Sequence, residues 1–190
     1  MYVGVGDSGS GEQKDIRRFN PQRLDNVNGK ILRIVPDLRA HTATSTVSEN
    51  GRYRIPNDNP FVAVDGARKE IWAAGLRNPH RLTWDVDPAH RTAPRLIAFN
   101  IGLTQWETVM IIAKGANYGY PKAEGYSTDP ALTSPIYAYK REEFNSTQAA
   151  ITGGVFYTGS MFPAQYQGKY FFADETNQFI RVYDPATPKQ

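Results

Sequence analysis

The stretch EIWAAGLRNPHRLTWD, residues 70–85, decides the fold. Apolar runs rich in β-branched and aromatic residues flank an Arg-Asn-Pro sequence, and this composition favours strands over a helix. Pro79 has no N–H and disfavours the helical conformation for Asn78. The pattern therefore predicts a hairpin whose turn covers residues 76–80. Arg77 projects from its rim, where scaffolds built of strands usually carry their functional groups.

The rest of the chain alternates between short apolar stretches and clusters of Gly, Asn, Asp and Pro, and no segment has a helical period. Residues 38–60 are predicted to be loop-like around a short extended segment at 53–55, and residues 87–94 to form a turn. This pattern indicates an all-β protein and, taken alone, leaves a sandwich and a propeller as alternatives. The other predicted strands cover residues 2–5, 30–35, 96–100, 109–112, 136–140, 154–157, 170–173 and 179–183.

Composition excludes several classes of function. The chain has 190 residues, a formal net charge of +3 and no cysteine. Its Lys and Arg residues are scattered and form no basic stripe, so we expect no nucleic acid as a partner. No apolar run approaches the ~20 residues of a membrane helix, so we expect no membrane insertion. Without cysteine, disulfides, thiolate catalysis and zinc–thiolate sites are excluded.

Several sequence blocks, in a fixed order, carry a resemblance that covers most of the chain. The chain resembles the soluble pyrroloquinoline-quinone (PQQ)-dependent sugar dehydrogenases of the glucose/sorbosone dehydrogenase family. The blocks are YVGVGDSG (2–9), GKILRIVPD (29–37), YRIPNDNPFV (53–62), the stretch at 70–85, QWETVMIIAKGANYGYPKAEGY (105–126) and ITGGVFYTG (151–159).

The resemblance implies a six-bladed β-propeller. At about 40–50 residues per blade, 190 residues fill about four blades. The expectation is therefore one partial propeller domain over residues 1–190, with blades missing at both ends. The chain also opens directly on the predicted strand at residues 2–5, which favours a fragment.

The activity implied by the resemblance is oxidation of an aldose to its lactone, by hydride transfer to PQQ and then to an external electron acceptor, in the periplasm or outside the cell. Arg77 is the candidate catalytic residue. Its guanidinium and the Asn78 amide would bind the quinone end of PQQ, and Arg77 would stabilise negative charge as the hydride arrives. Thr152 would contact the cofactor, and Asp7 would form part of the wall of the substrate pocket.

The resemblance also implies Ca²⁺, held against PQQ by the backbone carbonyls of Gly102 and Leu103, since carbonyl oxygen is a suitable hard ligand. A second, structural Ca²⁺ site would involve Glu124, Tyr126 and Asp129. For these three residues an ordinary acidic loop is the alternative interpretation.

The catalytic base is missing from the pattern. In the family, a His precedes the strand that matches residues 2–5, and His41, His80 and His90 do not correspond to it. The chain as given is therefore expected to be inactive. The alternative function is a non-catalytic propeller that binds carbohydrate or protein, as Hedgehog-interacting relatives do.

Overall fold

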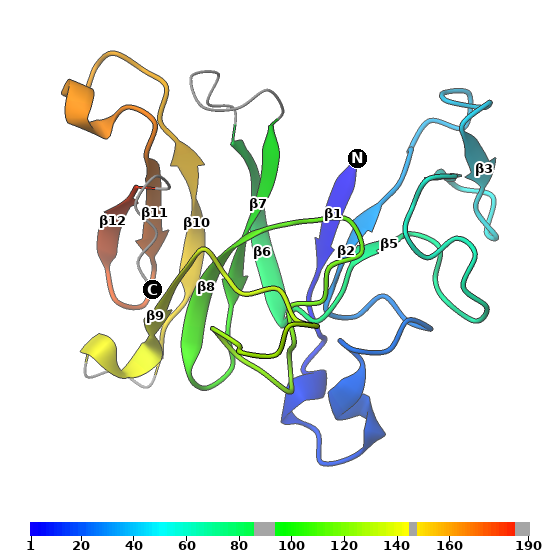
Figure 1. The fold of residues 1–190 in the computed structure, drawn as a ribbon, viewed down its shortest axis with the longest axis horizontal. Helices are drawn as coiled ribbons and strands as arrows, with labels where there is room; N and C mark the ends of the chain where they lie inside the picture. Colours follow the sequence, from blue (N-terminus) through cyan, green and yellow to red (C-terminus); the bar gives the residue numbers. More distant parts are fainter. Residues whose placement is uncertain (86–93, 145–147, 185–190) are drawn as a thin grey trace.

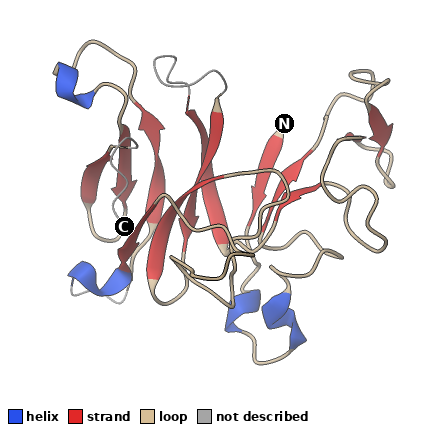
Figure 2. Cartoon of the chain, viewed as in Figure 1, coloured by secondary structure: helices blue, strands red, loops and turns tan. Residues whose placement is uncertain are grey.

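The computed structural model describes residues 1–85, 94–144 and 148–184 (Figure 1). Strands and irregular segments make up this part of the chain, with only short 3-10 helices (Figure 2), so the all-β prediction is confirmed. The strands are β1 (Tyr2–Val5), β2 (Lys30–Arg33), β3 (Ser45–Val47), β4 (Arg54–Pro56), β5 (Ile71–Ala73), β6 (Asn78–Asp85), β7 (Arg95–Ile101), β8 (Trp106–Ile111), β9 (Tyr137–Lys140), β10 (Ile151–Phe156), β11 (Tyr170–Asp174) and β12 (Phe179–Tyr183). The 3-10 helices are η1 (Ser10–Glu12), η2 (Ile16–Phe19), η3 (Arg141–Phe144) and η4 (Ala164–Tyr166).

Three antiparallel sheets stand side by side like the blades of a propeller (Figure 1). Their strand orders are β1-β2-β5, β6-β7-β8-β9 and β10-β11-β12. In each sheet the first strand along the chain lies at one edge, and β6 contacts both β1 and β10. These three first strands therefore lie next to one another, as the inner strands of neighbouring blades do.

The predicted hairpin at residues 70–85 is wrong. Both segments are strands, but β5 pairs with β2 in the first sheet and β6 pairs with β7 in the second. Asn78 begins β6 opposite Ile101, and Pro79 lies next to a register shift, where its missing N–H is tolerated. The turn is thus shorter than predicted and crosses from one sheet to the next.

Part of the chain length goes into an excursion from the first sheet. Residues 38–60, predicted to be loop-like, contain the two-stranded sheet β3-β4. The length suggested about four blades, whereas the described strands give three blade-like sheets, because the excursion does not build a further blade. The turn predicted at 87–94 lies almost wholly outside the described residues.

Two apolar clusters hold the sheets together. One lies between the second and third sheets and includes Phe99, Tyr139, Ile151 and Phe172. The other lies between the first and second sheets; its buried members are Ile31, Ala73, Leu76, Leu96, Ala98, Met110, Ile112 and Tyr118. Leu76, fully buried just before Arg77, anchors the crossover, and its burial stabilises the fold by about 2 kcal/mol.

Within the described ranges, no helix is both long and apolar enough to cross a membrane.

Candidate active site

The backbone at Arg77 is fixed by two neighbouring segments. The N–H groups of Arg77 and Asn78 both donate to Oδ1 of buried Asn100, at 3.2 and 3.0 Å. The Arg77 carbonyl accepts from the Asp7 N–H at 2.7 Å. Asn100 at the end of β7 is therefore a positioning residue that the sequence did not reveal, because its partners lie in another strand.

The Arg77 guanidinium lies over the loop that follows β7. Its Nη1 donates to the Gly102 carbonyl at 3.0 Å, and its Nη2 lies 3.5 Å from the Glu12 carboxylate. Nε is buried and has no hydrogen-bond partner among the described residues, while the side chain as a whole is 21% exposed. Arg77 is thus anchored on one side and open on the other.

The Gly102 carbonyl also accepts a hydrogen bond from a second guanidinium group. Nη1 of Arg141 donates to it at 3.2 Å and also forms a short ion pair with fully buried Glu107. Glu107 further accepts from the N–H groups of Gly102, at 3.3 Å, and Ile151, at 3.1 Å. Burial raises the pKa of Glu107 to about 8, against the opposing effects of the Ile151 N–H and Arg141. No sequence pattern pointed to Glu107 or Arg141.

Glu124 fixes the rest of this loop. The backbone N–H groups of residues 103–106 lie 2.6 to 3.4 Å from its Oε1, so one carboxylate gathers four donors. Gly102 has no room for a side chain, since a Cβ there would lie 1.8 Å from the Trp106 carbonyl oxygen and 2.4 Å from Glu124 Oε1. The loop is therefore held by side chains of this protein on both sides.

The three residues predicted for a second calcium site have other contacts. Glu124 faces the loop as described, Asp129 accepts from the Ala131 N–H at 2.9 Å, and the Tyr126 ring packs edge-on against Trp106. Among residues 1–85, 94–144 and 148–184 there is no group of three acidic or histidine side chains that could hold a metal ion.

Asp7 organises the loop after β1. Its buried carboxylate accepts from the N–H groups of Gly9, at 3.0 Å, and Gly11, at 2.9 Å. A Cβ on Gly11 would lie 1.6 Å from the Tyr120 hydroxyl, so only glycine fits there. Burial, and then the nearby Asp7 carboxylate, raises the pKa of Tyr120. The structure thus places Asp7 beside the Arg77 backbone, with its oxygens directed to its own loop.

Thr152 lies in β10, the strand of the third sheet that contacts β6. Its hydroxyl donates to the Ala173 carbonyl at 3.2 Å. The next residue, Gly153, has a φ of +107°, and a Cβ there would lie 2.6 Å from the Arg81 side chain of β6. The structure therefore brings Thr152 to the same row of inner strands as Arg77 without a direct hydrogen bond between the two.

The described histidines do not join this group. His41 is exposed in the excursion and has a φ of +53°, and His80 is exposed in β6. Neither side chain forms a hydrogen bond or ion pair with Arg77 or Asp7. His90 lies outside the described residues.

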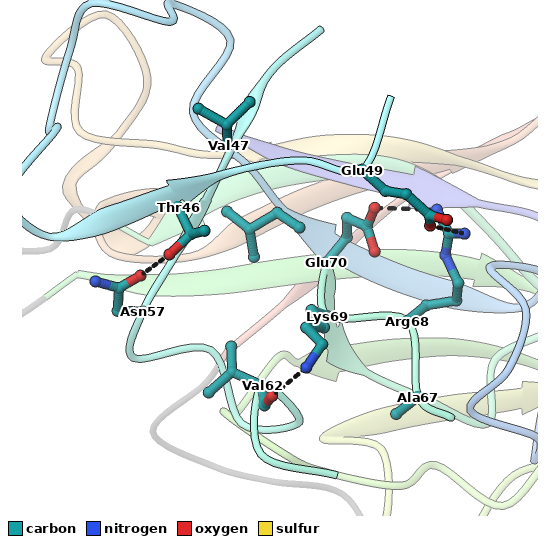
Figure 3. A pocket seen from close by; sticks show the side chains of 10 residues that line it. Thr46, Val47, Glu49, Asn57, Val62, Ala67, Arg68, Lys69 and Glu70 are labelled. Carbon is teal, nitrogen blue, oxygen red and sulfur yellow. Dashed lines mark hydrogen bonds and ion pairs between the residues drawn. The ribbon is translucent and has the colours of Figure 1, made fainter. Parts of the chain in front are cut away.

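The crevice beneath Arg77 is small. It has a volume of about 10 Å³ and is lined by residues that include Arg77, Gly102, Tyr120 and Glu124, so it has room for roughly one water molecule. A larger ligand would have to lie on the open rim above the guanidinium. A cavity of about 600 Å³ lies elsewhere, between β3-β4 and the segment before β5 (Figure 3). None of these Arg77-site residues lines that cavity.

Comparison with known proteins identifies the family. The sequence profile described as "Glucose / Sorbosone dehydrogenase" matches residues 1–184. The chain belongs to the glucose/sorbosone dehydrogenase family. The chain is 34% identical to HIPL2 protein of Arabidopsis thaliana over 192 residues, which is 92% of this chain and 26% of that protein. It is 30% identical to aldose sugar dehydrogenase YliI of Escherichia coli over 178 residues, covering 90% and 40%.

Solved structures agree with this assignment. The structure of the soluble aldose sugar dehydrogenase from Escherichia coli matches with a TM-score of 0.65 at 25% identity, covering 96% of this chain and 47% of that one. The PQQ-bound aldose sugar dehydrogenase from Streptomyces coelicolor matches with a TM-score of 0.57 at 20% identity, covering 96% and 45%. The fold is thus part of a sugar dehydrogenase propeller. The chain spans between about a quarter and half of these proteins.

Proposed function

We propose that this chain forms the Arg77 side of a PQQ-dependent aldose dehydrogenase. The observation that carries the proposal is the Arg77 guanidinium itself, which the Gly102 carbonyl anchors, while its partly exposed outer side has only a 3.5 Å contact with the exposed Glu12 carboxylate. The exposed donors of a fixed cation suit a planar anionic ligand rich in acceptor oxygens. PQQ is such a ligand, so these residues fit it.

When bound, PQQ would accept the hydride from the anomeric carbon of the aldose, and loss of the hydroxyl proton would complete the lactone. Arg77 would donate to the quinone oxygen and stabilise its growing negative charge. Asn78 would add its side-chain amide, which makes no hydrogen bond within the described ranges. Thr152 would contact the cofactor from β10, and Asp7 would support the pocket wall through its loop.

The remaining parts of the proposal rest on the family. They are an aldose substrate, an external electron acceptor and a periplasmic or secreted location, and they follow from the similarity to the E. coli aldose sugar dehydrogenase. No described histidine lies at Arg77, so the base that takes the hydroxyl proton would come from outside the described residues. The proposed function includes no calcium ion at Gly102 and Leu103, because the Gly102 carbonyl already accepts hydrogen bonds from two guanidinium groups.

A hybrid enzyme tests the proposal. Residues 1–184 would replace the matching segment of the E. coli aldose sugar dehydrogenase, which supplies the rest of the ring. The folded hybrid, given PQQ and an aldose, should form lactone and reduce an artificial dye. A hybrid that folds and binds PQQ but forms no lactone would contradict the proposal.

A non-catalytic binding module is the second candidate. Two observations favour it: the 34% identity to HIPL2 protein, a name that states no reaction, and the lack of any hydrogen bond or ion pair between the described histidines and Arg77 or Asp7. Under this function the hybrid would retain its fold but bind no PQQ, and titration with sugars or with a protein partner would show saturable binding.

A further inference from the structure

The loop expected to bind calcium presents a carbonyl that is already fully used. Gly102 oxygen accepts from Arg77 Nη1 at 3.0 Å and from Arg141 Nη1 at 3.2 Å. A carbonyl oxygen has two lone pairs, and both are engaged by these donors.

The charges around this oxygen also oppose a metal ion. Ca²⁺ binds carbonyl oxygen at about 2.3–2.6 Å, which would place it within roughly 6 Å of both guanidinium nitrogens. Arginine keeps its charge at every accessible pH, so neither group can give way by losing a proton. Glu107 forms an ion pair with Arg141 rather than offering a free ligand oxygen.

The loop does not need a metal for its shape. Glu124 gathers the N–H groups of residues 103–106 on one side, and Glu107 accepts the Gly102 N–H on the other. Arg141 is only 9% exposed and is fixed by Glu107, so its charge is preorganised.

We infer that two guanidinium groups, that of Arg77 and that of Arg141 held by Glu107, replace calcium at the Gly102 carbonyl. This site therefore works without the metal. Arg141 is a positioning residue: it supplies fixed positive charge beneath the rim and holds the carbonyl that anchors Arg77. The PQQ part of this inference rests on the proposed function, whereas the exclusion of calcium does not.

Two measurements on the 190-residue chain test the exclusion of calcium. The melting temperature should be the same in chelator and in excess Ca²⁺, because a ligand that binds only the folded chain would raise it. Tb³⁺, a luminescent substitute for Ca²⁺, should give no saturable emission sensitised by Trp106, whose ring lies on this loop. Emission that Ca²⁺ displaces and that W106F abolishes would overturn the inference, as would a rise in melting temperature with Ca²⁺ that saturates over the same concentration range as that emission.

A third measurement tests the role of Arg141. PQQ should quench the tryptophan fluorescence with equal affinity in chelator and in Ca²⁺. The double variant E107Q/R141M, which leaves no buried charge unpaired, should bind PQQ about tenfold more weakly, whereas R39M, in an exposed loop, should not differ from the parent. Binding that requires Ca²⁺, or equal affinity in the double variant, would overturn the inference. If PQQ does not bind the parent chain, the same titration on the hybrid with the E. coli enzyme decides the role of Arg141. If PQQ does not bind the hybrid either, the proposed function fails, and the melting and Tb³⁺ measurements still decide the calcium question.

Discussion

Gly102 joins four charged side chains into one unit. Its carbonyl accepts from Arg77 and Arg141, and its N–H donates to Glu107. A Cβ at this position would collide with the Trp106 carbonyl and with Glu124. A peptide unit so placed transmits any movement of the loop directly to Arg77. The contacts of Glu124 are therefore expected to matter for stability more than its partial exposure suggests.

Replacing Glu124 by Gln tests this clamp. The substitution keeps the shape of the side chain but removes the charge toward which four N–H groups point, so unfolding should become easier by about 1–3 kcal/mol. Chemical denaturation measures the difference. Glu49→Gln is the matched control, since that side chain is 93% exposed and its ion pair with Arg68 is long, at 3.9 Å. Equal losses in both variants would contradict the clamp.

At the level of single residues, sequence reasoning placed Arg77 at a rim because Pro79 and the apolar runs are local signals. Asn100, Glu107 and Arg141 were missed, because each acts on a segment that is distant in the sequence and only the fold brings them together. The functional roles of Asp7 and Thr152 stay predictions.

The crossover between β5 and β6 shows the same limit for whole elements. Composition and Pro79 predicted two strands and a turn, and both strands exist. Their partners were not predictable locally, because β5 adds to β2 and β6 adds to β7 through contacts between distant segments. Gly75, with a φ of +78°, allows the chain to leave one sheet for the next.

Lys30 at the start of β2 ties a further segment to this crossover. It is fully buried, and its ammonium donates to the carbonyls of Asn20, Pro21 and Asn28 at 2.7 to 2.9 Å. The adjacent Gly29 carbonyl accepts from the Leu76 N–H, immediately before Arg77. The segment around residues 20–30 thus supports the position of the rim.

The titration of Lys30 gives a test in solution. Burial lowers its pKa to about 7, below its usual value of 10.5. Between these values the Lys30 side chain binds more protons in the unfolded chain than in the folded chain, so Lys30 should contribute a rise in the free energy of unfolding as pH increases from about 7 to about 10. Lys30→Met should lack this rise, measured by denaturation at a series of pH values, while exposed Lys122→Met should keep it. A slope that persists in Lys30→Met would contradict the assignment.

For the whole molecule, the third sheet presents an apolar face to solvent. Val155 of β10 and Val182 of β12 both lie opposite Phe171 and share its face, and Ile180 lies on the same side. Their exposed fractions are 58%, 41% and 76%. In a propeller such a face packs against another sheet, and left open it favours association.

The 190-residue chain is therefore expected to associate in solution. Sedimentation equilibrium should show species larger than the monomer, and Ile180→Lys combined with Val182→Lys should shift the distribution toward the monomer. Val64→Lys, at an exposed site outside this face, should not. A parent chain that remains monomeric at all concentrations would contradict the expectation.

For the whole molecule, sequence blocks in a fixed order predicted the family and the all-β fold, because several motifs in one order are far more specific for a family than any single motif. The length predicted about four blades, and the described residues form three blade-like sheets and the two-stranded β3-β4 excursion, because length cannot distinguish a blade from such an excursion.

The proposed role of Arg77 is to stabilise charge on the quinone as the aldose is oxidised. The most direct test is the rate at which sugar reduces PQQ in the hybrid with the E. coli aldose sugar dehydrogenase, compared between the parent and Arg77→Ala, with the PQQ affinity of each measured by titration. The rate should fall by about 10²–10³, while the affinity changes less than about tenfold. The control Arg39→Ala should match the parent. Equal rates for Arg77→Ala and the parent would contradict the claim.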